Sequence, residues 1–300
     1  MEWGIGSKSI IFVNKIILPI MRIFSFFIAL FFICINGFSQ SQEELVAKAK
    51  EIVKEANEIY NRERASWVAT DILLKETKGN FDNMGGYFSY PDVDGTIKCI
   101  FFSNTAPVKV LYTMSTDTLF KVKKFKIDKK AREFTSMEKD IYDLRKASFD
   151  RISSDTTFKL YKKTEMNVVP IINGNTRKAY VLTATSVNGT VLFGNDYLIT
   201  FDKNNTITEI EKLHSALIPM EYATDKKAEK EDPHGGIHTH LPGKSPYMTP
   251  TDICTARLYK EYTKWKELAV VSEKYSSLYL IDTNALIIIP KSFFRDQKQK

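Results

Sequence analysis

The chain has 300 residues, of which 43% are hydrophobic and 26% are charged, and its formal net charge is +7. This apolar content is sufficient for a packed core and excludes an intrinsically disordered protein, while the length allows one or two domains. Residues 121–132 are rich in lysine. Such a stretch is more often a solvated strand and helix start than a binding surface for an acidic polymer, so we expect no nucleic-acid partner.

The first 39 residues differ in character from the rest. Their apolar stretch, residues 23–35, carries no charge and is too short to span a bilayer comfortably. Gly37 and Ser39 stand three and one residues before Gln40, which is the pattern that signal peptidase cleaves. We therefore predict a signal peptide over residues 1–39 and an exported mature chain, periplasmic or secreted, without a stable membrane anchor.

Two alternatives remain open for this leader. Translation could start at Met21, which would leave Arg22 as the positive region before the apolar stretch. An uncleaved anchor would also use residues 10–20, but it would place Lys15 and Arg22 within the membrane at substantial cost.

The remaining chain predicts an α+β fold in two regions, residues 40–155 and 156–300. The first region has the periodicity of a long helix, four strands of an antiparallel sheet that opens with a hairpin, and a second helix that starts without a strong cap. These elements are expected, in chain order, over residues 43–77, 86–90, 96–103, 108–113, 118–127 and 129–149.

The second region predicts strands joined by Asn-Gly and Asn-Asn turns, a charged loop over residues 225–232, a strand that carries histidines, one helix and three final strands. Apart from the histidine strand, these elements are expected over residues 168–172, 179–186, 190–201, 206–214, 249–267, 268–272, 277–281 and 285–290. The chain would then end in a β-helix-β unit.

Two cysteines, Cys99 and Cys254, remain after cleavage of the leader. An oxidising compartment would allow them to pair if their Cα atoms lie close together. Both stand among apolar residues, which favours two buried free thiols.

The histidines give the clearest indication of chemistry, because all four fall between residues 214 and 240. Residues i and i+2 of a strand face the same side, so His238 and His240 can present two imidazoles to one ion. Asp252, at the start of the following helix, would complete a three-ligand zinc site with an open position for water. His214, at the end of a strand, is a further candidate ligand, and His234 is the least favoured.

Each of these residues also has an explanation without a metal. Thr249 and Asp252 fit a capping box with Pro250 at the first helical position, and that role alone would account for Asp252. His238 and His240 could be polar residues on a solvated strand face. Both interpretations remain open.

The pattern of His238, His240 and Asp252 resembles the JAMM (JAB/MPN-type) zinc metallopeptidases, whose motif is His-x-His, ten residues and Asp, with a Ser three residues before the Asp. Here the spacer has eleven residues, Leu241 follows the second His where the family usually has Pro, and Thr249 occupies the Ser position. The resemblance is best over residues 234–282. It implies zinc held by the two histidines and Asp252, a peptide or amide substrate, and Thr249 as a catalytic hydrogen-bond donor to the developing oxyanion.

The family's catalytic Glu opens a strand as Glu-x-x-Gly after a long first helix, and the nearest frame here has Asn83 in that place. Asn83 cannot accept a proton, and Glu165, Glu209 or Glu211 would replace the Glu only if folding brought one of them to the site. Two hypotheses follow: an exported zinc-dependent hydrolase, or a non-catalytic exported protein whose histidine cluster is structural or binds metal without turnover. A surface interaction module that uses the basic stretch is a weaker third.

Overall fold

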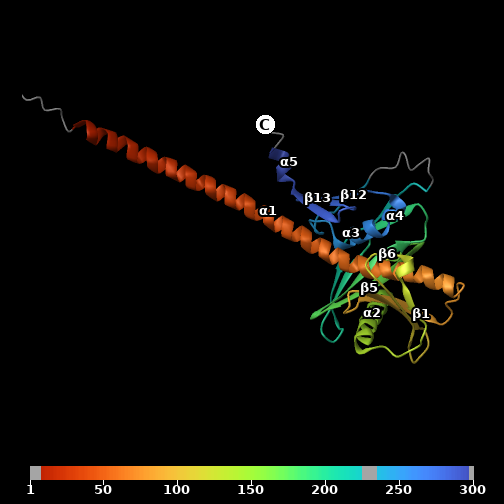
Figure 1. Cartoon of the computed structure of the whole chain (residues 1–300). Helices are drawn as coiled ribbons and strands as arrows, with labels where there is room; N and C mark the ends of the chain where they lie inside the picture. The colour runs from red at the N-terminus through yellow and green to blue at the C-terminus, as the bar shows by residue number, and fades with distance from the viewer. Residues whose placement is uncertain (1–7, 225–234, 297–300) are drawn as a thin grey trace, which may run out of the picture. The chain divides into compact units, whose positions relative to one another are not determined.

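The computed structural model describes residues 8–224 and 235–296, and the chain divides into two units, residues 1–48 and 49–300. Helices combine with mostly antiparallel sheets, which confirms the predicted α+β class (Figure 1). Among the helices of the described ranges, none has the length and apolarity that a membrane crossing requires. The signal peptide, export and the division near residue 155 stay predictions.

Helix α1 (Lys8–Glu76) contains the predicted helix of residues 43–77. From Ala49 onward its buried residues recur at helical spacing, and three parts of the core pack against them. Ile59 packs with strands and a helix of the C-terminal half, including Tyr180 and Cys254. Ala69 packs with the first sheet, including Cys99. Both cysteines are buried and free, as predicted.

The first sheet is antiparallel in the order β1-β2-β3-β4, so the predicted hairpin at its start is confirmed. Its strands are β1 (Met84–Pro91), β2 (Ile97–Ser103), β3 (Val110–Thr116) and β4 (Lys126–Asp128). The expected strand over residues 118–127 is wrong. Phe120 adopts a φ of 53° and buries its ring against Tyr60, and a 3-10 turn follows at Val122–Lys124, so only the last residues pair.

Helix α2 (Ser136–Ser154) starts later than expected and has the strong cap that we did not expect. Thr135 and Glu138 form a capping box. Glu138 is fully buried, and it accepts hydrogen bonds from both terminal nitrogens of Arg132, at 2.6 and 2.8 Å, and from the Tyr90 hydroxyl at 2.7 Å. Burial opposes ionisation of Glu138, but these donors outweigh burial and lower its pKa to about 2.

The second sheet is antiparallel in the order β5-β6-β8-β9. Its strands are β5 (Thr164–Asn173), β6 (Thr176–Thr185), β8 (Tyr197–Phe201) and β9 (Ile207–Lys212). The single strand expected over residues 190–201 is wrong, because the chain breaks at Gly194 and Asn195. Strand β7 (Thr190–Gly194) instead pairs with β10 (Leu217–Glu221), a strand that sequence patterns missed.

Backbone geometry explains this break. Gly194 has a φ of 74°, and a Cβ added there would lie 2.2 Å from the Ala216 carbonyl oxygen, so only glycine fits. Asn195 has a φ of 53°, and its side chain donates to Lys159 O and to the Thr183 hydroxyl. The chain therefore leaves one sheet and enters the next within two residues.

The third sheet is formed by β11 (Gly235–Thr239), β12 (Glu267–Val271), β13 (Tyr275–Leu280) and β14 (Ala285–Pro290). Strands β11 and β12 are parallel and the other pairs are antiparallel. Instead of one helix over residues 249–267, the crossover has two, α3 (Pro250–Leu258) and α4 (Lys260–Thr263), and α4 ends at Lys264 in the left-handed conformation. The predicted β-helix-β unit is present, and α5 (Ser292–Asp296) follows β14.

Glu138→Gln tests the buried ion pair. Because the folded-state pKa of Glu138 lies below its ordinary value of 4.5, its ionised form stabilises the fold above that value, and the stabilisation is lost as the pH falls toward 2. The difference between the folded-state pKa and the ordinary pKa of Glu138 corresponds to about 3 kcal/mol of folding stability at neutral pH. We expect urea unfolding to show a loss of about 3 kcal/mol at pH 7 and roughly half of that at pH 3.

Asp143→Asn, which removes an exposed carboxylate from the same helix, serves as the control for this change. It should alter the free energy of unfolding by less than about 0.5 kcal/mol. If the loss of unfolding free energy in Glu138→Gln is the same at pH 3 as at pH 7, the ionised pair is not the cause of that loss.

Candidate metal centre

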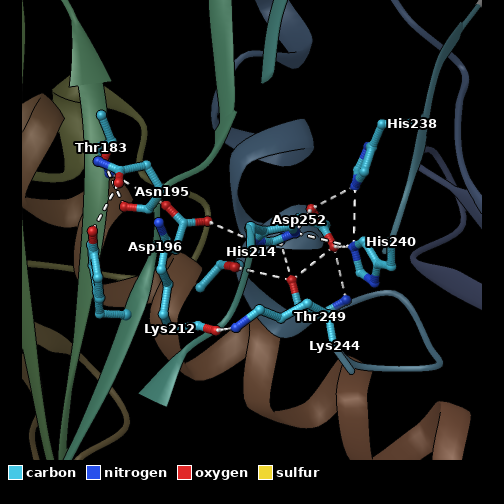
Figure 2. Close-up of polar contacts among 12 residues, drawn as sticks. Thr183, Asn195, Asp196, Lys212, His214, His238, His240, Lys244, Thr249 and Asp252 are labelled. Atoms are coloured by element: carbon cyan, nitrogen blue, oxygen red, sulfur yellow. Dashed lines mark hydrogen bonds and ion pairs between the residues drawn. The ribbon is translucent and has the colours of Figure 1, made fainter. Parts of the chain in front are cut away.

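The chain brings His214, His238, His240 and Asp252 together in one buried cluster (Figure 2). One ligand atom from each residue lies within 4.8 Å of the others. These are the four metal-ligand candidates of the sequence, and the structure gathers all of them.

His238 lies on β11 and His240 directly after it, and both are buried while Thr239 between them is exposed. Strand alternation therefore directs both imidazoles to the same side, as predicted. The backbone of His240 continues the pairing with β12 through a hydrogen bond to Val271 O. The His238 ring lies beside Phe193, with ring centroids 5.5 Å apart.

His214 follows β9, where the chain turns toward β10, and its side chain is 2% exposed. Its Nε2 faces the cluster, whereas its Nδ1 faces the Asp196 carboxylate at 3.6 Å. The backbone on either side of the β7–β8 break supports this placement, because Leu213 N donates to Asp196 O and Asn195 N to Ala216 O. His214 therefore stands between two carboxylates.

Asp252 serves both as a helix cap and as a member of the cluster, so the two interpretations of this residue are compatible. Its Oδ2 accepts from the Thr249 backbone N–H at 2.8 Å and from the Thr249 hydroxyl at 2.7 Å. Its Oδ1 lies 3.1 Å from His214 Nε2 and 3.2 Å from His238 Nε2. The capping box thus fixes the carboxylate where the imidazoles converge.

The spacing of the ligand atoms fits one small ion. Besides the two contacts to Asp252 Oδ1, His240 Nε2 lies 3.1 Å from His214 Nε2, 3.3 Å from His238 Nε2 and 3.4 Å from Asp252 Oδ2. Ligands at the usual zinc–nitrogen and zinc–oxygen distances form a tetrahedron with edges of about 3.3 to 3.4 Å. For the tetrahedron formed by the three Nε2 atoms and Asp252 Oδ1, four of the six edges are within a few tenths of an ångström of that value, and all ligand atoms lie within 4.8 Å of one another.

The donor chemistry also fits a metal. His240 Nδ1 lies 3.0 Å from Ser245 O, so it donates there and leaves the Nε2 lone pair facing the cluster. Asp252 Oδ1 is buried, and its nearest polar neighbours are the Nε2 atoms of His214 and His238, neither of which makes a well-directed hydrogen bond to it. A buried carboxylate oxygen without a donor is costly, and a cation at the convergence of the three Nε2 atoms would satisfy it.

The pKa shifts within the cluster also favour a positive charge at this site. Burial alone would lower the pKa of His214, but the carboxylates of Asp252 and Asp196 raise it to about 9. Burial alone would raise the pKa of Asp252, but His214 and His238 hold it well below its usual range. The buried carboxylate thus attracts positive charge, which either a protonated imidazole or a metal ion can supply.

Asp196 is the residue of this site that sequence patterns missed. Burial raises its pKa to about 7, with a further contribution from Asp252. Its carboxylate lies 3.6 Å from His214 Nδ1, which is too long for a hydrogen bond but close enough to favour positive charge on the ring. The available signal was Gly194-Asn195-Asp196, three turn-type residues inside an apparent strand.

A cavity of about 540 Å³ opens onto the cluster. All three histidines border it, as do Ile237, Leu241 and Lys244, and Lys244 Nζ also donates to Lys212 O. No carboxylate of the described residues lines this cavity. The cluster is therefore accessible from one side, through imidazole rings and apolar side chains.

The candidates for a catalytic carboxylate lie elsewhere. Asn83 is exposed just before β1, and Glu209 and Glu211 are exposed on β9. Glu165 borders a different cavity. Thr249 does not line the cavity at the cluster, and its hydroxyl donates to Asp252 Oδ2, so its predicted role as an oxyanion donor stays a prediction. His234 lies outside the described residues.

Asp196→Asn tests whether this carboxylate supports the cluster. Asparagine keeps the shape but removes the charge beside His214, so zinc affinity should fall by about 10- to 100-fold in competition titrations against a chelator. Asp150→Asn, on an exposed carboxylate of α2, should leave affinity unchanged. Equal affinities for Asp196→Asn and the unmodified protein would exclude this supporting role.

Comparisons of the chain with protein-family models, with curated proteins and with solved structures find no match.

Proposed function

We propose that this protein binds one zinc ion through His214, His238, His240 and Asp252, and that the ion has a structural role. The observation that carries the proposal is the convergence of four buried ligand atoms, which all lie within 4.8 Å of one another. Three imidazoles and one carboxylate form a donor set that suits zinc.

The number of protein ligands favours a structural ion over a catalytic one. Structural zinc sites are closed by four protein ligands, whereas catalytic sites keep a position open for water. The sequence suggested three ligands with His214 as a further candidate, and His214 Nε2 lies among the ligand atoms of the other three. None of the described residues that line the adjoining cavity carries a carboxylate, which supports the same conclusion, because hydrolysis needs a proton acceptor.

A zinc ion at this place would connect three separate parts of the chain. His214 lies between β9 and β10, the histidine pair lies on and after β11, and Asp252 opens α3. An ion that binds only the folded arrangement stabilises it by mass action, by about 4 kcal/mol at a free concentration a thousand times its dissociation constant.

Metal analysis of the purified protein tests this function. We expect about one zinc per chain, a lower Tm after chelation, and recovery of the Tm when zinc is restored. His238→Ala and His240→Ala should abolish both the bound zinc and the Tm response, because each removes a ligand. Ser215→Ala, an exposed neighbour of His214 at the same cavity, should behave like the unmodified protein. A metal-free protein whose Tm ignores added zinc would refute the proposal.

A second candidate is the zinc-dependent hydrolase of peptide or amide bonds that the JAMM resemblance implies. The cavity on the histidine side of the cluster favours it. Zinc with an exchangeable position would lower the pKa of its water toward neutrality. His238, His240 and Asp252 would then be the ligands, and His214, which lies beside Asp196, would be the proton acceptor in place of the family's Glu.

His214→Ala separates the two candidates. If His214 is a fourth ligand of a structural ion, the variant should lose zinc or bind it at least 100-fold more weakly, with a Tm near that of the chelated protein. If His214 is a proton acceptor, the variant should retain zinc and its Tm but lose hydrolysis of a fluorogenic peptide library that the unmodified protein cleaves. We expect the first outcome.

A further inference from the structure

A second cavity, of about 560 Å³, lies apart from the histidine cluster and shares no lining residue with the first. Helices α1 and α2, strands β1 and β5, and the segments around Tyr222 and Tyr259 contribute its walls. Its size is typical of cavities that hold small organic molecules. Arg145, Glu63 and a group of aromatic rings distinguish it from an ordinary apolar cavity.

Arg145, on α2, is the only basic residue of the described lining. Its guanidinium carbon lies 4.5 Å from the centroid of the Phe149 ring and 6.0 Å from that of Tyr87. No carboxylate of the described residues lies within ion-pair distance, and Nε is buried without a hydrogen-bond partner. Burial lowers the pKa of Arg145 to about 10, which leaves it charged at neutral pH. A planar guanidinium held in this way is suited to a carboxylate.

Glu63, on α1, is a second charged group at the cavity and is only 5% exposed. Trp67 Nε1 and Asn167 Nδ2 donate to its Oε1 at 2.9 and 2.6 Å. No described residue donates to Oε2, which leaves that atom for a ligand. Burial raises the pKa of Glu63 to about 7. A bound ammonium group would favour its ionised form.

The remaining wall is largely aromatic. The rings that border the cavity are Trp67, Tyr87, Phe149, Tyr222, Tyr259 and Tyr262. Trp67 and Tyr259 meet edge to face at 5.4 Å, and Tyr259 lies 6.1 Å from Tyr262. Such rings provide a large, stiff surface for a flat apolar group.

The charged residues of the cavity favour a zwitterionic ligand over a purely anionic or purely cationic one. Asp71 and Glu165 are exposed residues of the same lining, so two exposed carboxylates and the carboxyl group of Glu63 face one guanidinium. This balance disfavours a purely anionic ligand such as phosphate, because the carboxylates repel it. A purely cationic ligand would leave Arg145 without a partner. A zwitterion satisfies both charged groups.

We propose that this cavity binds a free aromatic amino acid, with its carboxylate on Arg145, its ammonium group toward Glu63 and its side chain against the tyrosines. The two charged groups select for a molecule that carries both functions, and the aromatic wall selects the side chain. The site is independent of the metal centre, so its test does not depend on zinc.

Isothermal titration of the purified protein with three related compounds tests the proposal. L-phenylalanine carries both charged groups, 3-phenylpropionate carries only the carboxylate, and 2-phenylethylamine carries only the ammonium. We expect saturable one-to-one binding of L-phenylalanine and binding at least tenfold weaker for each of the others. No saturable binding of L-phenylalanine, or binding of 3-phenylpropionate as tight as that of L-phenylalanine, would overturn the proposal.

Variants assign the contacts. Arg145→Met should weaken L-phenylalanine binding at least tenfold, whereas Arg151→Met, which removes an exposed arginine from the same helix, should not change it. Glu63→Gln keeps both hydrogen bonds to Oε1, so it should weaken L-phenylalanine but not 3-phenylpropionate. If Arg145→Met does not fold, Arg145→Lys keeps the charge and should still bind measurably less tightly. Unchanged affinity in the folded Arg145 variant would contradict the assignment.

Discussion

The buried carboxylate of Asp252 is the constraint on which this part of the structure depends. A carboxylate without solvent must find donors or positive charge, and Asp252 meets this need from two directions. One oxygen receives the first backbone and side-chain donors of α3, and the other faces two imidazoles. Because one residue does both, the start of α3 and the position of the histidines cannot vary independently.

Helix α1 positions the same region from the other side. Ile59 packs with Cys254 and Leu258 of α3, and Arg257 of α3 places its guanidinium 3.7 Å from the centroid of the Tyr60 ring. The helix that carries Asp252 is therefore held at its first turn by the cluster and along its length by α1. The cluster can keep its geometry because the scaffold on both sides is rigid.

Local patterns in the sequence predict most elements and all four candidate ligands, and the exceptions have physical causes. Alternation along strands predicts the hairpin and the face shared by His238 and His240, and helical spacing places Asp252 at a helix start. Patterns can predict these features because each depends on residues close in sequence. The capping box of α2 was readable from Thr135 and Glu138. The β7–β8 break left only the weak signal of turn-type residues at 194–196, because its position depends on contacts of Gly194 and Asn195 with the distant Ala216 and Thr183. Sequence patterns did not predict Asp196 as part of the site, because this residue follows the same break.

The four residues of the cluster are close in sequence, and this bears on how the protein folds. His214 and His238 are 24 residues apart, and His240 and Asp252 are 12 apart. Closing loops of this length costs little chain entropy, whereas the contacts of α1 with α3 join residues about 200 apart. A metal ion bound by these four residues would therefore cross-link short loops, whereas the contacts with α1 close the longest ones.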